Sequence, residues 1–194
     1  LHKQSIETAA RNLRYGYFER LRQDIGAEAI VVAHHRDDNV ETVLMNLVRG
    51  TGLNGMVGIR AVNGHVLRPL LGVSRSDIET YLRRKGQTYV TDSTNLETDA
   101  TRNKFRLEVM PQLCSINPNA PRGIDTTARH LQEAEKMVRW AVDQLSHETV
   151  TVGNDGIDVI SVDKLLFSPS PEYLLVEIIG RYGLRLMEVG TNHL

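Results

Sequence analysis

A short apolar run between two amphipathic segments is the feature that most constrains the fold of this chain. Residues 4–25 repeat apolar side chains at helical spacing, and residues 37–49 do the same. Between them, Ala29–Ala33 contains no polar side chain, which is typical of a strand buried on both faces of a parallel sheet. Helix, strand and helix in this order predict an α/β fold.

The alternation of elements continues along the next part of the chain. We expect a glycine-rich loop over residues 50–58, a strand over 66–71, a helix over 75–85 that begins at a Ser74–Asp77 capping box, a strand over 88–91 and a helix over 100–114. This order predicts a domain with a mostly parallel sheet.

A proline-rich stretch divides the chain. Pro111 and residues 117–121 mark the boundary, so we predict two domains, residues 1–116 and residues 117–194. The second domain is predicted to be mainly helical and to carry a β-hairpin. Its expected elements are a helix over 123–148, hairpin strands over 150–152 and 157–160, and a helix over 171–182.

The composition narrows the classes of protein to which the chain can belong. Cys114 is the only cysteine, which excludes a disulfide framework, a cysteine-rich zinc site and a cysteine-ligated iron–sulfur cluster within the chain. No apolar run approaches the roughly 20 residues that cross a bilayer, and the cysteine usage suits a reducing cytoplasm. The 23 Lys and Arg balance the 24 Asp and Glu, which argues against a non-specific DNA coat but allows a local basic patch.

Histidines and carboxylates gather directly after the predicted strand. They are His34, His35, Asp37, Asp38 and Glu41. Ligands bind at the carboxyl ends of strands in open α/β sheets, so a site is expected here. With a helix that begins near Asp37, Asp38 and Glu41 share a face, and their carboxylates suit Mg²⁺ or an ammonium group. The alternative is that these acids only favour the helix N-terminus through its dipole, and for Asp37 both interpretations stay open.

A second polar cluster surrounds the start of the last helix of the first domain. Arg102 and Arg106 are one helical turn apart and can bind one phosphate or two adjacent ones, and Asn103 adds an amide. A solvated helix face is the alternative, and spacing alone favours it. Arg11 and Arg14 on the first helix allow the same two interpretations, contact with RNA or a solvated face.

Several short motifs stand in a fixed order between residues 5 and 110. They are Ala10-Arg11 with Arg14-Tyr15, residues 33–42 with 47–55, Leu67–Leu71 with Ser74-Arg75, and Asp92–Asn95 with Thr101–Asn103. Together they resemble the tRNA(Ile)-lysidine synthetase family, a group of PP-loop ATP pyrophosphatases with a Rossmann-like fold. The second domain resembles that family only in general character, as a helical domain that helps to hold tRNA.

The resemblance implies an ATP-dependent ligase. In that family the wobble cytidine of an isoleucine tRNA with a CAU anticodon is adenylated at its C2 oxygen, and the ε-amine of free L-lysine then displaces AMP. The implied cofactors are ATP and Mg²⁺, and the implied partners are tRNA(Ile) and L-lysine. A cytoplasmic location is expected, and a homodimer is left open.

The resemblance also implies roles for individual residues. The implied catalytic residues are Asp38, Glu41 and His34, and the implied Mg²⁺ ligands are Asp38 and Glu41. Binding of the substrate or adenylate is implied for Arg102, Asn103 and Asp37. Contact with tRNA is expected for Arg11, Arg14 and Arg106.

The chain departs from the family at the ATP loop. A Ser-Gly-Gly-x-Asp-Ser segment after the first strand is not found, and Gly50-Thr51-Gly52 follows a helix instead of opening one. We therefore expect an internal piece of a longer protein, without the first strand of the fold, and no ATP turnover by this piece alone.

Three other functions are alternatives to an ATP-dependent ligase. The single cysteine argues against a tRNA cytidine 2-thiolating enzyme of the same superfamily. A metal-dependent phosphohydrolase built on His34, His35, Asp37 and Asp38 needs further ligands, and no obvious set is found. A non-catalytic tRNA-binding module fits the piece as it stands.

Overall fold

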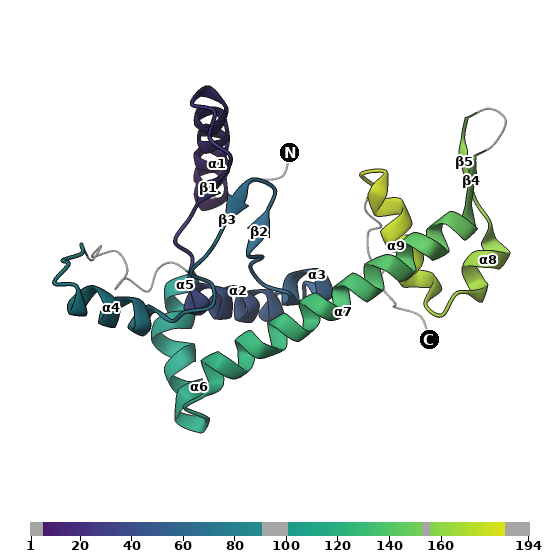
Figure 1. The fold of residues 1–194 in the computed structure, drawn as a ribbon. Helices are drawn as coiled ribbons and strands as arrows, with labels where there is room; N and C mark the ends of the chain where they lie inside the picture. Colours follow the sequence, from purple (N-terminus) through teal and green to yellow (C-terminus); the bar gives the residue numbers. More distant parts are fainter. Residues whose placement is uncertain (1–5, 91–100, 153–155, 185–194) are drawn as a thin grey trace. The chain divides into compact units, whose positions relative to one another are not determined.

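The structure is a computed structural model, and it describes residues 6–90, 101–152 and 156–184 (Figure 1). Contacts separate the chain into two units, residues 1–131 and residues 132–194. The division falls inside the 30-residue helix α7 (Ala120–Thr149), so this helix contributes to both units. The domain assignment of residues 1–116 and 117–194 stays a prediction.

The first unit is a mixed α/β arrangement of helices and short strands. Its elements are α1 (Ile6–Asp24), β1 (Ile30–Val31), α2 (Arg36–Val48), α3 (Gly52–Met56), β2 (Val62–Asn63), β3 (Val66–Leu67), α4 (Arg75–Arg84), α5 (Thr101–Lys104), a π-helical turn (Phe105–Val109), α6 (Met110–Ile116) and the first part of α7. Ser74 caps α4 through the predicted capping box with Asp77. The short helix α3 replaces the loop expected over residues 50–58.

The described sheet of the first unit is small and mixed, whereas the sequence predicts a mostly parallel one. Its strand order is β1-β3-β2, with β1 parallel and β2 antiparallel to β3. Val31 is 65% exposed, so the run that contains β1 is not buried on both faces. Residues 88–90 form no strand, and Thr91 lies outside the described residues.

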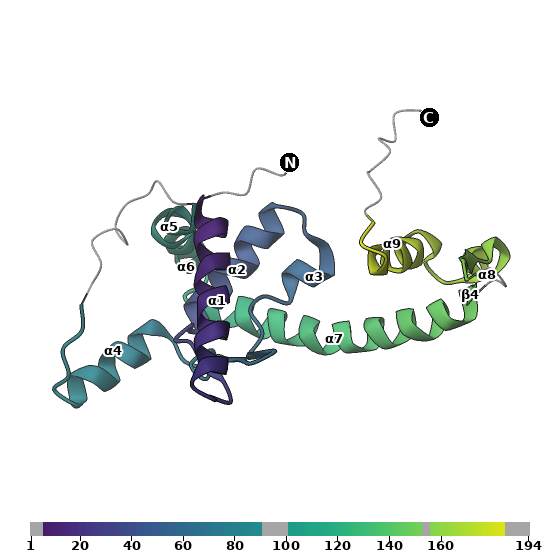
Figure 2. The ribbon, with the colours of Figure 1, turned by 90° about the horizontal axis from the view of Figure 1, so that it is seen from above.

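Helix α2 forms the centre of the first unit. It buries Val40, Val43 and Leu44. Figure 2 shows α2 between α3 and the α5–α6 run, and both make contacts with it. The period of its apolar residues explains why α2 folds as the sequence predicts.

Asn39 ties α2 to two other segments. This side chain is 3% exposed. Its Oδ1 accepts a hydrogen bond of 2.7 Å from the backbone N–H of Ile59, and its Nδ2 donates one of 3.0 Å to Asp125 Oδ1 in α7. Buried amides need such partners because they have lost their water.

A π-helical turn interrupts the helix predicted over residues 100–114. The backbone N–H of Met110 donates to the carbonyl of Phe105, five residues earlier. Pro111 follows directly and has no N–H to donate. Pro111 therefore lies inside a continuous helical run.

The second unit is mainly helical and carries a hairpin, as predicted. After α7 it contains β4 (Val150–Val152), β5 (Asp158–Ile160), α8 (Val162–Phe167) and α9 (Pro171–Arg181). β4 and β5 pair antiparallel, and the core consists of Val142, Leu165, Leu174 and Ile178. None of the helices described in either unit has the length and apolar character needed to cross a membrane.

Candidate functional site

The site lies where β1 and β3 end. The two strands are parallel, so their carboxyl ends meet at the edge of the sheet where α/β folds bind ligands. β1 leads through His34 and His35 into α2, and β3 leads into Arg68, which is 6% exposed. The histidine and carboxylate cluster therefore lies at the expected edge.

Asp37 and Asp38 each accept a hydrogen bond from a helix N-terminus. The Asp38 carboxylate accepts one of 2.9 Å from the backbone N–H of His35, which precedes α2. The Asp37 carboxylate accepts one of 2.9 Å from the backbone N–H of Arg75, the first residue of α4. Asp37 thereby holds the start of α4 beside the start of α2.

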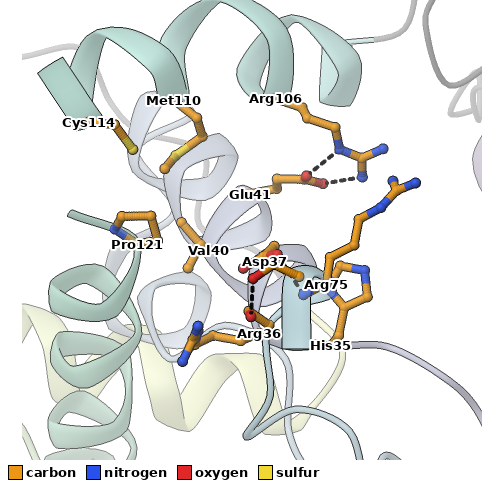
Figure 3. Close-up of a pocket in the computed structure, with 12 residues that line it drawn as sticks. His35, Arg36, Asp37, Val40, Glu41, Arg75, Arg106, Met110, Cys114 and Pro121 are labelled. Carbon is orange, nitrogen blue, oxygen red and sulfur yellow. Dashed lines mark hydrogen bonds and ion pairs between the residues drawn. The ribbon is translucent and has the colours of Figure 1, made fainter. Parts of the chain in front are cut away.

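Glu41 is buried and forms a two-bond ion pair with Arg106. Arg106 Nε and Nη2 donate to the two carboxylate oxygens at 2.7 and 3.0 Å (Figure 3). This hydrogen bonding raises the pKa of Arg106 above its usual value, against the effect of burial. Arg102 Nε lies 3.8 Å from Glu41 Oε2, and Arg102 Nη2 donates to the Thr42 hydroxyl at 3.2 Å. The second sequence cluster therefore packs on α2 and is not a solvated helix face.

A pocket of about 360 Å³ opens beside this ion pair. Its apolar wall consists of Val40, Met110, Cys114 and Pro121, and its polar wall consists of His35, Arg36, Asp37, Glu41, Ser74, Arg75, Ser76 and Arg106. Figure 3 shows the apolar side chains on one side and His35, Arg75 and Arg106 on the other. Such a pocket suits a small ligand with an aliphatic part and charges of both signs.

Burial holds the pKa of the His34 imidazole below its usual range. Asp38 acts in the opposite direction, and the guanidinium groups of Arg68, Arg11 and Arg102 lower the pKa further. His34 is therefore mainly neutral near pH 7 and is able to accept a proton.

The lowered pKa of His34 predicts a loss of stability in acid. The unfolded chain takes up a proton at His34 at a higher pH than the folded protein does. Stability is therefore complete above about pH 6.5 and declines as the pH falls toward the folded-state pKa. Thermal unfolding should show a melting temperature a few degrees lower at pH 5.5 than at pH 7.5, and His34→Gln should remove part of this decline. His130→Gln, at an exposed position of α7, is the control, and an unchanged acid decline in His34→Gln would contradict the prediction.

The remaining predicted residues surround the site to different extents. Asn103 is half-buried in α5 next to Arg102. Arg11 lies on α1 with its guanidinium over the Tyr15 ring, 5.2 Å from the centroid, while Arg14 is exposed on the same helix. The motif at 92–95 lies outside the described residues.

Sequence reasoning assigned no role to two buried polar residues, Arg68 and Asn39. Arg68 stood in a motif of the resemblance, but no role was attached to it. Asn39 occupies the same face of α2 as Val43, four residues later, so an amide in an apolar stripe was the available signal. Both side chains form hydrogen bonds with other segments of the chain, and a local sequence pattern does not reveal such bonds.

No group of three or more His, Cys, Asp or Glu side chains suited to a metal ion occurs in the part of the chain that the structure describes. Both oxygens of Glu41 accept hydrogen bonds from Arg106, and Asp38 accepts one from His35. The arrangement of these two carboxylates therefore does not fit Mg²⁺ as it stands, and the Mg²⁺ site stays a prediction.

Comparison with known proteins matches residues 1–113 to a family model described as a PP-loop domain. Proteins named tRNA(Ile)-lysidine synthase are similar over more of the chain. The one from Parabacteroides distasonis is 50% identical over 179 residues, which is 92% of this chain and 40% of the relative. Those from Bacteroides thetaiotaomicron and Porphyromonas gingivalis are 43% and 37% identical, over 95% and 97% of this chain and 42% and 41% of the relatives. The chain thus spans about two fifths of the length of the curated relatives it matches.

Proposed function

Since this chain belongs to the PP-loop domain family, we propose that it forms part of an ATP-dependent tRNA(Ile)-lysidine synthase. The reaction would join L-lysine to C2 of the wobble cytidine in a tRNA(Ile) with a CAU anticodon, through an adenylated tRNA. The complete protein would have a Rossmann-like, mostly parallel sheet and a cytoplasmic location, and a homodimer remains open. The observation that carries the proposal is the pocket of mixed charge at the carboxyl ends of β1 and β3.

The pocket has the chemistry that free lysine requires. The aliphatic stem of lysine would pack against Val40 and Met110, which stand on the apolar wall. Asp37 provides a carboxylate for an ammonium group, and Arg36 and Arg75 provide cations for the lysine carboxylate. An uncharged amino acid of similar length would leave the Asp37 carboxylate without a counter-charge from the ligand, which favours lysine over it.

Glu41 and Arg106 line this pocket, and His34 is not among its lining residues. Arg106 Nη2 also lies 3.9 Å from Asp38 Oδ1, and Arg102 approaches Glu41 from the other side. We propose that lysine binds on the pocket side and the adenylate on the His34 side, where Arg102 and Asn103 would bind it. Asp38 would orient the attacking amine, and neutral His34 would accept its proton.

Arg106 changes role in this proposal. Because its guanidinium is already bonded to Glu41, it would position that carboxylate and would not contact tRNA. The tRNA would contact Arg11 and Arg14 on α1, where an arginine can bind a phosphate.

The second domain would contribute to tRNA binding through shape and stacking. Residues 117–194 contain seven Lys and Arg and eleven Asp and Glu, so they neutralise few phosphates. Trp140 is 67% exposed on α7. An exposed indole is available to stack on a base.

The proposal is tested with the complete reading frame that encodes these residues. The assay follows incorporation of labelled lysine into tRNA(Ile) with a CAU anticodon in the presence of ATP. Asp38→Asn is expected to lower the rate about 100-fold or more, because the amine loses its orienting charge. A wild-type protein that binds this tRNA but incorporates no lysine would instead support the non-catalytic module.

Asp77→Asn is the matched control. Asp77 occupies the third position of α4, and its carboxylate accepts a hydrogen bond from the backbone N–H of Ser74. Asp38 occupies the same position in α2 and accepts a hydrogen bond from the backbone N–H of His35. Both variants weaken one capping box, so a loss of activity confined to Asp38→Asn separates chemistry from capping. Equal activity of the two variants would contradict the role of Asp38 in orienting the attacking amine.

A further inference from the structure

Arg68 is a buried cation without a carboxylate partner among the described residues. Arg68 is 6% exposed, and its Nη1 donates a hydrogen bond of 2.8 Å to the carbonyl of Arg60. Its Nε is shielded from solvent and has no hydrogen-bond partner. Burial of an unpaired guanidinium is unfavourable by several kcal/mol in general, so such a group points to a missing anion.

His34 stands on the same side of the sheet edge as Arg68. In the parallel pairing of β1 with β3, Val31 lies opposite Leu67, and the backbone N–H of Val32 donates a hydrogen bond to the Leu67 carbonyl. One residue further along both segments, Val32 therefore lies beside Arg68. Alternate residues of an extended strand share a face, which places His34 on the face of Val32. His34 Nδ1 is also buried without a partner, so two unsatisfied nitrogens lie at this edge.

Three guanidinium groups and one carboxylate act on the His34 imidazole. Arg68, Arg11 and Arg102 all lie close enough to His34 to lower its pKa, and Asp38 is the acid that acts against them. Arg102 Nε is a third shielded nitrogen without a hydrogen-bond partner. Several guanidinium groups around one point suit a tetrahedral anion with more than one charged oxygen better than a planar carboxylate.

We propose that Arg68, with His34, forms a subsite that binds a phosphoryl group at the carboxyl ends of β1 and β3. The inference rests on the proposed function, which supplies two sources of that group, the adenylate and the RNA backbone. Bound phosphoryl oxygens would accept hydrogen bonds from Arg68 Nε and from a His34 nitrogen. Arg68 would thereby hold the nucleotide side of the site while the pocket holds the amino acid.

The first experiment follows the His34 imidazole by NMR during a pH titration with and without inorganic phosphate. An anion beside His34 stabilises the imidazolium, so phosphate should raise the pKa of His34. In Arg68→Met the pKa of His34 should be higher without phosphate, because a neighbouring cation has gone, and phosphate should no longer shift it. Arg49→Met, at an exposed position after α2, should keep the wild-type response.

Competition distinguishes the two sources. If AMP displaces phosphate from His34, the group belongs to the adenylate, and if a short RNA with a 5′-hydroxyl displaces it, the group belongs to the RNA backbone. A wild-type His34 that does not respond to phosphate, or an unchanged response in Arg68→Met, would overturn the proposal. These readouts need no lysine transfer, so they fail separately from the ligase assay.

Stability separates this role from a purely structural one. An unpaired buried charge is retained for binding and not for folding, so Arg68→Met should keep or raise the melting temperature while it loses the phosphate response. A large fall in melting temperature would assign Arg68 to the fold. Arg68→Lys, which keeps a charge but loses the planar fork, should fold and bind phosphate more weakly than the wild type.

Discussion

Replacement of Arg106 by methionine is expected to lower the free energy of unfolding by about 3 kcal/mol. Glu41 is 2% exposed, and both of its carboxylate oxygens accept hydrogen bonds from Arg106. Removal of Arg106 leaves a buried carboxylate with only the more distant Arg102 as a counter-charge. Loss of one partner of a buried pair costs about 3–5 kcal/mol, and the lower end applies because Arg106 is partly exposed.

Denaturant unfolding of single and double variants measures this effect. Arg106→Met with Glu41→Met removes both charges, so the double variant should be less destabilised than the two single losses added together. Arg22→Met is the control, since Arg22 forms the same two-bond geometry at 3.0 and 2.7 Å with Glu19, whose carboxylate is 38% exposed. A loss in Arg22→Met as large as that in Arg106→Met, or strictly additive losses at Glu41 and Arg106, would show that burial does not govern the pair.

Gly58→Ala is expected to lower the free energy of unfolding by a similar amount, about 3 kcal/mol. Gly58 has a φ of +67°, and a Cβ built there lies 2.2 Å from Asn39 Oδ1. That oxygen accepts a hydrogen bond from the backbone N–H of Ile59, so Asn39 must move and this part-buried hydrogen bond is lost. The left-handed backbone costs an alanine about 1–2 kcal/mol, and the lost hydrogen bond adds about 1–3 kcal/mol.

Gly50→Ala isolates the backbone contribution to this loss. Gly50 has the same φ of +67°, and nothing lies within 4 Å of a Cβ built there. Only the strain of the left-handed conformation should appear, so thermal or denaturant unfolding should give a clearly smaller loss than in Gly58→Ala. Equal losses at the two glycines would mean that Asn39 adapts without loss.

Local patterns predicted the elements that carry their own signals. The apolar period of residues 37–49 gave α2, the Ser74–Asp77 spacing gave the start of α4, and the four-residue turn between two alternating runs gave the hairpin of β4 and β5. In each case the stabilising partners are close in sequence. Sequence patterns also grouped His34, Asp38 and Glu41, because all three follow one strand and the two acids share one helix.

Features that depend on distant partners were not predicted. β2 has only two residues, too few to show a period, although Asn63-Gly64 is a turn signal. The strand predicted over residues 66–71 is limited to the two residues of β3. The pairing of Glu41 with Arg106 joins residues 65 positions apart, and it holds the partly exposed Arg106 against α2. Spacing alone therefore favoured a solvated face for two arginines that the fold uses to line its site.

The π-helical turn before Pro111 determines which side chains of this helical run lie on the same face. In a regular α-helix, residues four apart advance about 40° around the axis at each step, so Arg102, Arg106 and Met110 would drift away from one another. A five-residue hydrogen-bonded turn advances less per residue and counteracts this drift. The turn thus acts as a one-residue insertion that corrects the phase of the helix. Deletion of one residue within Phe105–Val109 should therefore restore a regular α-helix and leave Arg102 and Met110 on the same line of the helix.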